Sequence, residues 1–359
     1  MKHRAQHFLI AALLTKVVAG WIFETSGPGA KEIIDVAFWN NRAFLCMSDK
    51  MAPPKPDKNG TDANAVSKAP PRKINYLGSA IFEAPWPEDA TQSWGLKALK
   101  IEAQELESEC MKLKAAVAID IDARGRMFTL LLGSKNCHPR IAVIDLVVNR
   151  QVSRTELTNA PRLTLRSLVV DYLNSDTRVY IGGVTDNLLI VYSFKEELWW
   201  RVKLESTGAA LPTSPPVPTA HLALAKREGV LYMTSSNSQF LFSMSLEQLS
   251  DIDKADGKSE CSQNRTLSPK LVGEKLGKSA GLMSDSRGGL IYSLLRDYAV
   301  VRWNTHAPLV AENHEVLIQS ADLLPDVRQI FKDSQKNVWA LNGLRNEEGS
   351  YCTRILKLN

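Results

Sequence analysis

A short pattern recurs along this chain at intervals of about 50 residues, and it constrains the fold more than any other feature. In each copy a polar or glycine turn precedes a short apolar strand that carries one aromatic residue. Five copies place their aromatic residues 52, 52, 60 and 47 positions apart, at Phe128, Tyr180, Tyr232, Tyr292 and Trp339. A period of about 50 residues is typical of the blades of a β-propeller.

Each copy is flanked by further strand-like runs, which makes it part of a meander. Apolar runs precede the aromatic residue at 116–119 and 168–170, and others follow it at 141–144, 188–192, 240–242, 299–303 and 354–358. Meanders that repeat around an axis form a propeller. A β-sandwich or a pair of β domains is the alternative.

A sixth copy, around Phe44, lies 84 residues before Phe128 and is stretched by two surplus segments. Residues 48–73 are polar and proline-rich, which predicts a surface insertion. Residues 93–109 carry leucines at roughly helical spacing, which predicts one helix. With six copies, we predict an all-β, six-bladed propeller that forms a single domain over residues 21–359.

The first 20 residues predict a secretion signal, because positive charges precede an apolar run and small residues follow it. Two glycosylation sequons, at Asn59 and Asn264, fit a secreted chain. No stretch has the roughly 20 apolar residues that a membrane helix needs. We therefore expect an extracellular protein without a membrane span.

Composition and motifs argue against several other classes of protein. The net charge is +5 and the basic residues are scattered, whereas nucleic-acid binding needs a clustered basic face. Five cysteines show no C-x-x-C spacing, so we predict no metal site. Because H-E-x-x-H, G-x-S-x-G and P-loop patterns are absent, we predict no catalytic residues and no cofactor.

Seven segments, in the correct order, resemble motifs of the insect yellow/major royal jelly protein family. Trp303-Asn304-Thr305 matches the family's W-N-T, for example, and Asp122 begins a segment similar to its D-x-C-G-R-L-W. All seven lie at 122–128, 137–146, 179–192, 273–275, 303–305, 338–342 and 353–356. The resemblance covers about residues 35–359 and implies a secreted propeller.

Cysteines are where the chain departs from this family. Arg124 stands where the family has the cysteine of D-x-C-G, and another family cysteine is missing around residues 172–178. Cys110 and Cys137 align with family cysteines, so the resemblance implies that their usual partners are absent. Either these two pair with each other or both thiols stay free.

The resemblance also implies a ligand site at the mouth of the central channel, where some family members bind small aromatic amines. The family's final-blade pattern maps onto Asn342 and Leu344. An asparagine amide can bond an amine or hydroxyl group, whereas a leucine lacks the π face that an aromatic or cationic ligand favours. Asn304 is a further candidate. For both asparagines the alternative is a structural role at a turn or strand end.

Three functions follow from the resemblance. The first is a non-catalytic role in maturing extracellular matrix, in cuticle or eggshell hardening or in melanin pigmentation, with matrix proteins or catecholamine-like molecules as partners. The second is an enzyme that converts dopachrome, for which Asp120 or Asp171 would supply the base. The third is a soluble binder of catecholamines or serotonin.

Overall fold

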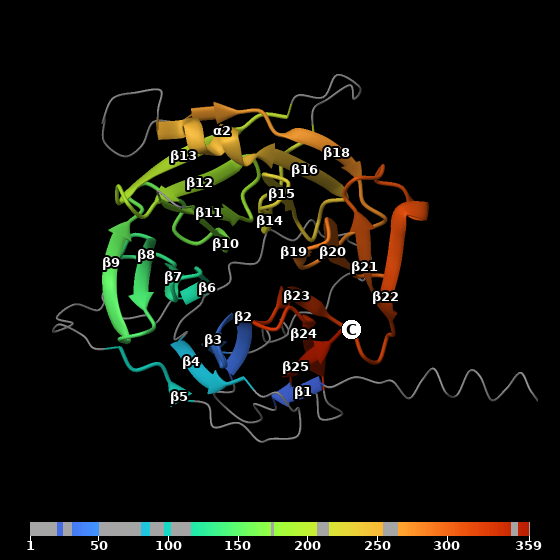
Figure 1. The fold of residues 1–359 in the computed structure, drawn as a ribbon, viewed down its shortest axis with the longest axis horizontal. Coiled ribbons are helices and arrows are strands. Elements are labelled where there is room, and N and C mark those ends of the chain that lie inside the picture. Colours follow the sequence, from blue (N-terminus) through green and yellow to red (C-terminus); the bar gives the residue numbers. More distant parts are fainter. Residues whose placement is uncertain are drawn as a thin grey trace, which may run out of the picture.

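Six sheets surround one axis, as Figure 1 shows. The computed structural model describes residues 20–23, 31–49, 80–86, 97–101, 116–173, 176–206, 215–253, 265–345 and 351–358. This arrangement is a six-bladed β-propeller, which confirms the predicted fold class.

Each blade is named here by its place along the chain, and its strands run outward from the axis. The first three blades consist of β2 (Lys31–Trp39), β3 (Arg42–Asp49), β4 (Ala80–Pro85) and β5 (Lys97–Ala98); β6 (Ala116–Ile121), β7 (Arg126–Leu131), β8 (Arg140–Asp145) and β9 (Arg150–Glu156); and β10 (Leu165–Tyr172), β11 (Thr177–Gly183), β12 (Leu188–Ser193), β13 (Leu198–Leu204) and β17 (Arg265–Leu267).

The last three blades follow the same plan. They consist of β14 (His221–Ala225), β15 (Val230–Thr234), β16 (Phe240–Ser245) and β18 (Lys270–Glu274); β19 (Leu282–Ser284), β20 (Gly289–Leu294), β21 (Ala299–Asn304) and β22 (His314–Gln319); and β23 (Val327–Lys332), β24 (Val338–Arg345), β25 (Tyr351–Lys357) and β1 (Gly20–Phe23). The inner strands contact one another in the cyclic order β2, β6, β10, β14, β19, β23 and back to β2.

Among the described residues, the core consists of six apolar clusters, and each lies between two adjacent blades. Successive residues of a strand face opposite sides. In β7, Phe128 and Leu130 therefore pack toward the third blade, whereas Met127 and Leu131 pack toward the first. A strand that is buried on both faces reads as a continuous apolar run, which is why the repeat was visible in the sequence.

Tight turns connect the inner strand of a blade to its second strand, and aspartates stabilise several of them. Asp122 accepts backbone hydrogen bonds from Arg124 and Arg126 at 2.9 and 3.0 Å. Gly125 has a φ of +78°, and a Cβ there would lie 2.5 Å from the Trp39 ring, so only glycine fits.

The third and fourth blades share a segment of chain. After β16, the fourth blade continues into the short helices α2 (Leu246–Ser250) and η2 (Asp251–Asp253). The chain then adds β17 to the outer edge of the third blade, parallel to β13, before it returns as β18. The third blade therefore has five strands, which the repeat did not predict.

Closure of the ring joins the two ends of the described chain. β1 pairs antiparallel with β25, so the sixth blade takes its outermost strand from the N-terminal part of the chain. Phe38 and Trp86 of the first blade pack against Phe331 and Trp339 of the sixth, with ring centroids 5.0–5.3 Å apart. Asp333 accepts hydrogen bonds from the indole N–H of Trp339 at 2.8 Å and of Trp86 at 3.3 Å.

Some sequence-based predictions concern residues that are not described, and one prediction for the first blade is wrong in part. Residues 1–19 and 50–79 are not described, and they hold most of the predicted signal segment and insertion. The helix predicted over 93–109 is wrong for residues 97–101, where β5 begins a non-helical stretch. There, pairing of β5 with β4 overrides the helical spacing of the leucines.

We predict that Asp333→Ala lowers the free energy of unfolding by about 2–4 kcal/mol, because it leaves two buried indole N–H groups and the backbone N–H groups of Gln335 and Asn337 without their acceptor. Chemical denaturation measures this change. Asp145→Ala is the matched control, since Asp145 also accepts two backbone N–H groups in a hairpin turn, from Val147 and Val148, and no hydrogen bond joins it to a tryptophan of the described residues. Equal losses in the two variants would contradict a special role of Asp333 in ring closure.

Candidate functional site

The propeller has two distinct ends, because its blades repeat by rotation about the axis. At the strand-start end, defined by Val327 and His221, the inner strands begin. At the hairpin end, defined by Gly125 and Gly288, they turn into the second strands.

Asn342 lies at the strand-start end, in β24 opposite Val327. Its side chain is fully buried, and its Nδ2 donates to the Ala340 carbonyl at 3.4 Å. Its Oδ1 has no hydrogen-bond donor among the described residues. A buried acceptor without a donor carries a free-energy cost, so this oxygen is the feature of Asn342 that a ligand's N–H or O–H would satisfy.

Asn304 lies at the hairpin end, opposite Gly289 and exposed. Its Oδ1 accepts the backbone N–H of His306 at 3.1 Å, and its carbonyl accepts the N–H of Ala307 at 3.0 Å. This is a local turn of the kind that asparagine favours. The structure therefore does not bring Asn304 and Asn342 together. Leu344 pairs with Cys352 between β24 and β25, and its side chain lies outside the described part.

Two basic side chains share the strand-start end, on the fourth blade. The His221 Nε2 lies 2.9 Å from the Ser236 Oγ. Burial lowers the pKa of His221 to about 3, and the positive charges of Arg166 and Lys275 lower it further. Lys275 is buried, donates to Thr234 and to the Ser238 carbonyl, and has its pKa lowered to about 7 by burial. Near neutral pH, His221 is therefore uncharged and Lys275 is only about half protonated.

Carboxylates on the inner strands connect one blade to the next. Asp35, in β2, accepts the backbone N–H of Ile119 in β6 at 2.8 Å and the amide of Gln329 in β23. Asp120, in β6, accepts the backbone N–H of Val170 in β10 at 2.7 Å. An inner strand is the edge of its own sheet, so its axis-facing N–H groups need acceptors from elsewhere.

Burial shifts the acidity of these groups. It raises the pKa of Asp35 to about 7, with a further rise from the charge of Asp120, and it raises the pKa of Asp120 to about 6. Asp171, in β10, is also buried. Its Oδ1 lies 3.1 Å from the Nζ of Lys226, the residue that follows β14, so an ion pair connects it to the next inner strand. Among the inner-strand carboxyls that the structure describes, Asp120 is the one that is partly exposed and has a pKa near neutrality, two properties of a general base.

Comparison with known proteins shows which family this chain is related to. The sequence profile described as "Major royal jelly protein" matches residues 115–347, which is more than half of the chain. The chain belongs to the major royal jelly protein family. The resemblance to the yellow/major royal jelly family that the motifs suggested is confirmed.

Two honeybee relatives illustrate the distance within the family. Major royal jelly protein 5 of Apis mellifera is 25% identical over 236 residues, which cover 61% of this chain and 39% of that protein. Major royal jelly protein 6 of Apis mellifera is 22% identical over 313 residues, or 81% of this chain and 64% of that protein. The matched part of this family member thus spans less than two thirds of either relative.

Solved structures of low identity share the fold alone. A catalytically inactive virginiamycin B lyase from Staphylococcus aureus, solved with quinupristin, has a TM-score of 0.52 at 8% identity and covers 96% of this chain and 100% of the lyase. A luciferin-regenerating enzyme has a TM-score of 0.51 at 9% identity, with 95% of both chains covered. These likenesses carry no argument about chemistry.

Cysteines of this royal jelly family member take two different states. Cys137 is disulfide-bonded. Cys110 lies outside the described residues, so its pairing with Cys137 stays a prediction. Cys46 is free and buried, and its thiol donates to the Ala116 carbonyl at 3.1 Å. Asn59 and Asn264 also lie outside the described residues, so their glycosylation stays a prediction.

Within the described part of the chain, no group of three or more His, Cys, Asp or Glu side chains is arranged to hold a metal ion. No helix in that part combines the length and the apolar character that a membrane crossing needs.

Sequence reasoning missed Asp35, His221 and Lys275 as notable groups. Lys275 does stand in the Gly273-Glu274-Lys275 motif of the family, which lies at the end of β18, and that motif could have pointed to it. Nothing local marks Asp35, because its partners Ile119 and Gln329 are 84 and 294 residues away.

We predict that the stabilising effect of Asp35 depends on pH. A carboxyl whose pKa is near 7 when folded and about 3.9 when unfolded binds protons more tightly in the folded state. Its contribution to stability is complete below about pH 4 and is lost as the pH rises through about 7. Between pH 8 and pH 5 the wild type should therefore gain about 2–4 kcal/mol in free energy of unfolding relative to Asp35→Asn, whose side chain does not titrate.

Denaturant unfolding at several pH values measures this difference. The wild type alone does not isolate it, because the lowered pKa of His221 acts in the opposite sense and costs stability as the pH falls below about 6.5. Subtracting the Asp35→Asn curve removes the His221 contribution. A difference that stays constant with pH would contradict a raised pKa of Asp35.

Proposed function

We propose that this chain is a secreted major royal jelly protein family member that acts by binding in extracellular matrix maturation, and that it is not a catalyst. The family resemblance supplies the setting, which is cuticle or eggshell hardening or melanin pigmentation. The predicted signal segment and the two sequons support secretion. Matrix proteins and catecholamine-like molecules are the expected partners.

One observation carries the non-catalytic part of this proposal. The inner-strand acids that would serve as a base for dopachrome conversion already hold structural bonds. Both oxygens of Asp120 accept backbone N–H groups, from Ile121 at 2.8 Å and from Val170 at 2.7 Å. Asp171 is buried and held by an ion pair between its Oδ1 and Lys226, but neither of its oxygens accepts a hydrogen bond among the described residues. Proton abstraction by Asp120 would weaken a contact between two blades, which favours a structural role for this carboxyl.

Dopachrome decay tests this proposal. We expect purified secreted protein to leave the decay rate within error of the buffer rate, and an antibody to find the protein in extracellular matrix. A saturable acceleration that Asp120→Asn abolishes, while Asp145→Asn at an outer turn does not, would overturn the proposal in favour of the enzyme.

A second candidate, binding of small aromatic amines, is favoured by the buried Asn342. Its Oδ1 lacks a donor among the described residues, and an ammonium or hydroxyl group of a ligand would supply one. At the same end of the propeller, on the fourth blade, His221 carries no positive charge near neutral pH and so does not repel a cation.

For this candidate we predict saturable binding of dopamine, serotonin or octopamine in calorimetry, weakened about tenfold or more by Asn342→Ala, since a lost bond to a charged group costs about 1.5–3 kcal/mol. Asn304→Ala, at the opposite end, is the control and should bind like the wild type. Thermal unfolding checks that both variants are folded. An absence of saturable heat with all three amines would exclude this candidate.

A further inference from the structure

The turns that connect each inner strand to its second strand, called the inner turns here, lie around the axis at the hairpin end. Among the described residues, every exposed charged side chain on these turns is basic. They are Arg124 in the second blade, Lys226 and Arg227 in the fourth, Arg287 in the fifth and Lys336 in the sixth, where Lys332 at the end of β23 is also exposed. The fold thus gathers basic residues that are scattered along the sequence.

The acidic side chains of the inner turns do not cancel this charge at the surface. None of them is exposed among the described residues, and most are bonded within the fold. Asp122 pairs with Arg126 at 2.6 Å, and Asp285 pairs with Arg302 at 2.6 Å. Asp333 accepts the two indole N–H groups described above. The exposed part of the inner turns therefore carries positive charge.

Contacts between neighbouring turns hold several of these cations in one row over the second to fifth blades, called the basic row here. The Nε of Arg124 donates to the Tyr172 hydroxyl at 2.8 Å, and Lys226 donates to the Tyr172 carbonyl. Arg227 then donates to the carbonyl of Ser286 at 2.7 Å, next to the arginine of the fifth blade. The second, third, fourth and fifth blades are thus linked at this end by basic side chains.

Three guanidinium groups of the basic row keep an uncompensated charge. Arg124, Arg227 and Arg287 are exposed, and none of them forms an ion pair with an acid of the described residues. Lys226, by contrast, lies 3.1 Å from the buried carboxylate of Asp171. A guanidinium group presents several N–H donors in a fixed plane and binds oxyanions through paired hydrogen bonds. The three arginines are therefore the groups that an anion would bind.

The strand-start end has no comparable separation of charge, because its turns expose acidic and basic side chains together. The exposed basic residues there include Lys135, Lys278 and Arg296, and the exposed acids include Asp186, Asp297 and Asp326. Charges of opposite sign largely cancel at a distance, whereas charges of one sign add. An anion is therefore attracted to the hairpin end rather than to the opposite end.

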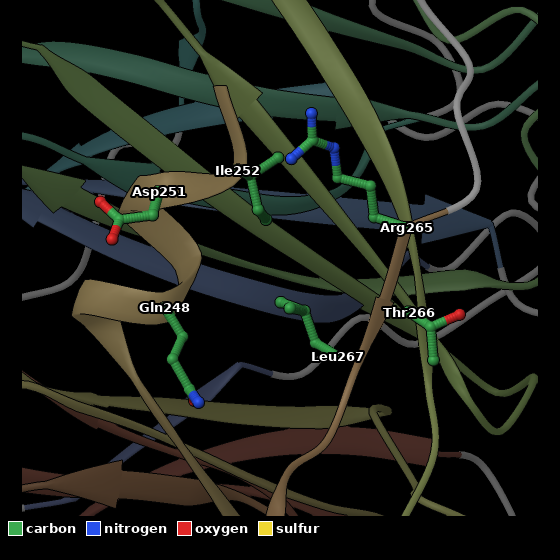
Figure 2. A pocket seen from close by; sticks show the side chains of 6 residues that line it. All are labelled: Gln248, Asp251, Ile252, Arg265, Thr266 and Leu267. Atoms are coloured by element: carbon green, nitrogen blue, oxygen red, sulfur yellow. The ribbon is translucent and has the colours of Figure 1, made fainter. Parts of the chain in front are cut away.

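The pocket on the outer side of the propeller also has no excess of positive charge. It has a volume of about 480 Å³ and lies between α2 and η2 on one side and β17 on the other, as Figure 2 shows. Arg265 is the basic residue of its lining, and Asp251 is the acidic one. The inner turns rather than this pocket therefore attract an anion.

We propose that the basic row binds a sulfated polysaccharide of the extracellular matrix. Sulfate groups on successive sugars are anions at regular intervals along a chain, which matches guanidinium groups placed one after another across the second to fifth blades. The contacts are charge-assisted hydrogen bonds from guanidinium N–H groups to sulfate oxygens. This inference rests on the extracellular setting of the proposed function and names a matrix component as the partner.

The basic row suits a polysaccharide better than a nucleic acid. Proteins that bind single strands stack the bases on aromatic side chains. Tyr172 is the aromatic residue of the row, and it is half-buried, with Arg124 5.3 Å and Lys226 5.7 Å from its ring centroid. Because cations already lie over this ring, ionic contacts are the means of binding that the row offers.

Calorimetry with heparin, a sulfated polysaccharide, tests the proposal on the purified secreted protein. We expect saturable binding that weakens as the salt concentration rises, because the contacts are ionic. Replacing the three arginines together, as Arg124→Gln, Arg227→Gln and Arg287→Gln, should weaken this binding about tenfold or more. Heparin from which the sulfate groups have been removed should give no saturable heat.

A matched variant removes the same charge from the opposite end. Lys135→Gln, Lys278→Gln and Arg296→Gln together lower the net charge as much as the first variant does, and they should leave the affinity for heparin within about twofold of the wild type. Thermal unfolding checks that both variants are folded. Equal weakening in the two variants would show an effect of net charge alone and would overturn the proposal.

Two further comparisons separate the chemistry of the row from its folding and from nucleic-acid binding. The conservative variant Arg124→Lys, Arg227→Lys and Arg287→Lys keeps the charge and should bind heparin better than the glutamine variant. Failure of this rescue in a folded protein would contradict an ionic site. Single-stranded DNA of matched length should bind about tenfold more weakly than heparin, and DNA binding as tight as that of heparin would overturn the choice of a polysaccharide.

The outcome also distinguishes this proposal from the proposed function. A protein that is found in extracellular matrix but gives no saturable heat with heparin would overturn the polysaccharide site and leave the proposed function intact. A chain that stays inside the cell would instead overturn the extracellular setting, and the polysaccharide site with it.

Discussion

A ring of blades is stable only if its last blade meets its first, and the rest of this structure depends on that junction. Three kinds of contact make it. β1 completes the sixth blade through backbone pairing with β25, aromatic rings interlock between the two blades, and Asp35 receives the amide of Gln329. Each contact joins residues from distant parts of the chain, so the junction forms only when the whole circle is in place.

The ring arrangement also determines which polar groups are needed near the axis. Inner strands pack beside one another without forming a shared sheet, which leaves backbone N–H groups without partners on one side. Asp35 and Asp120 supply acceptors at two successive junctions. Burial at these junctions raises the pKa of both carboxyls. A carboxyl with a raised pKa, which is also found in active sites, therefore arises here from a structural role. A raised pKa in a propeller of this type is therefore weak evidence for catalysis by itself.

Much of the fold could be predicted from the sequence, because the second strand of each blade is buried between two neighbours and reads as an apolar run around one aromatic residue. Tyr180 and Tyr292 are 1% and 0% exposed, as their place in the repeat implies. Long-range pairing left no such trace. Neither the union of β1 with β25 nor the transfer of β17 to the third blade has a local signature, since β17 has three residues and its partner strand is far away in the sequence.

For the candidate site, the sequence predicts which residue types are present but not at which end of the propeller each of them lies. Asn304 and Asn342 both follow a tryptophan-bearing strand motif, yet one closes a turn at the hairpin end and the other is buried at the strand-start end. The difference arises because Asn304 lies in the third strand of its blade and Asn342 in the second, which run in opposite directions. Direction within a blade becomes visible only when the register is known.

The parallel pairing of β13 with β17 also has a consequence for biosynthesis. β13 ends at Leu204 and β17 begins at Arg265, so roughly 60 residues must be made before the third blade acquires its last strand. At about 5–20 residues per second, the outer edge of that blade stays open for about 3–12 s on the ribosome. During this interval the nascent chain presents a bare strand edge, and the fourth blade must be largely synthesised before its neighbour is finished.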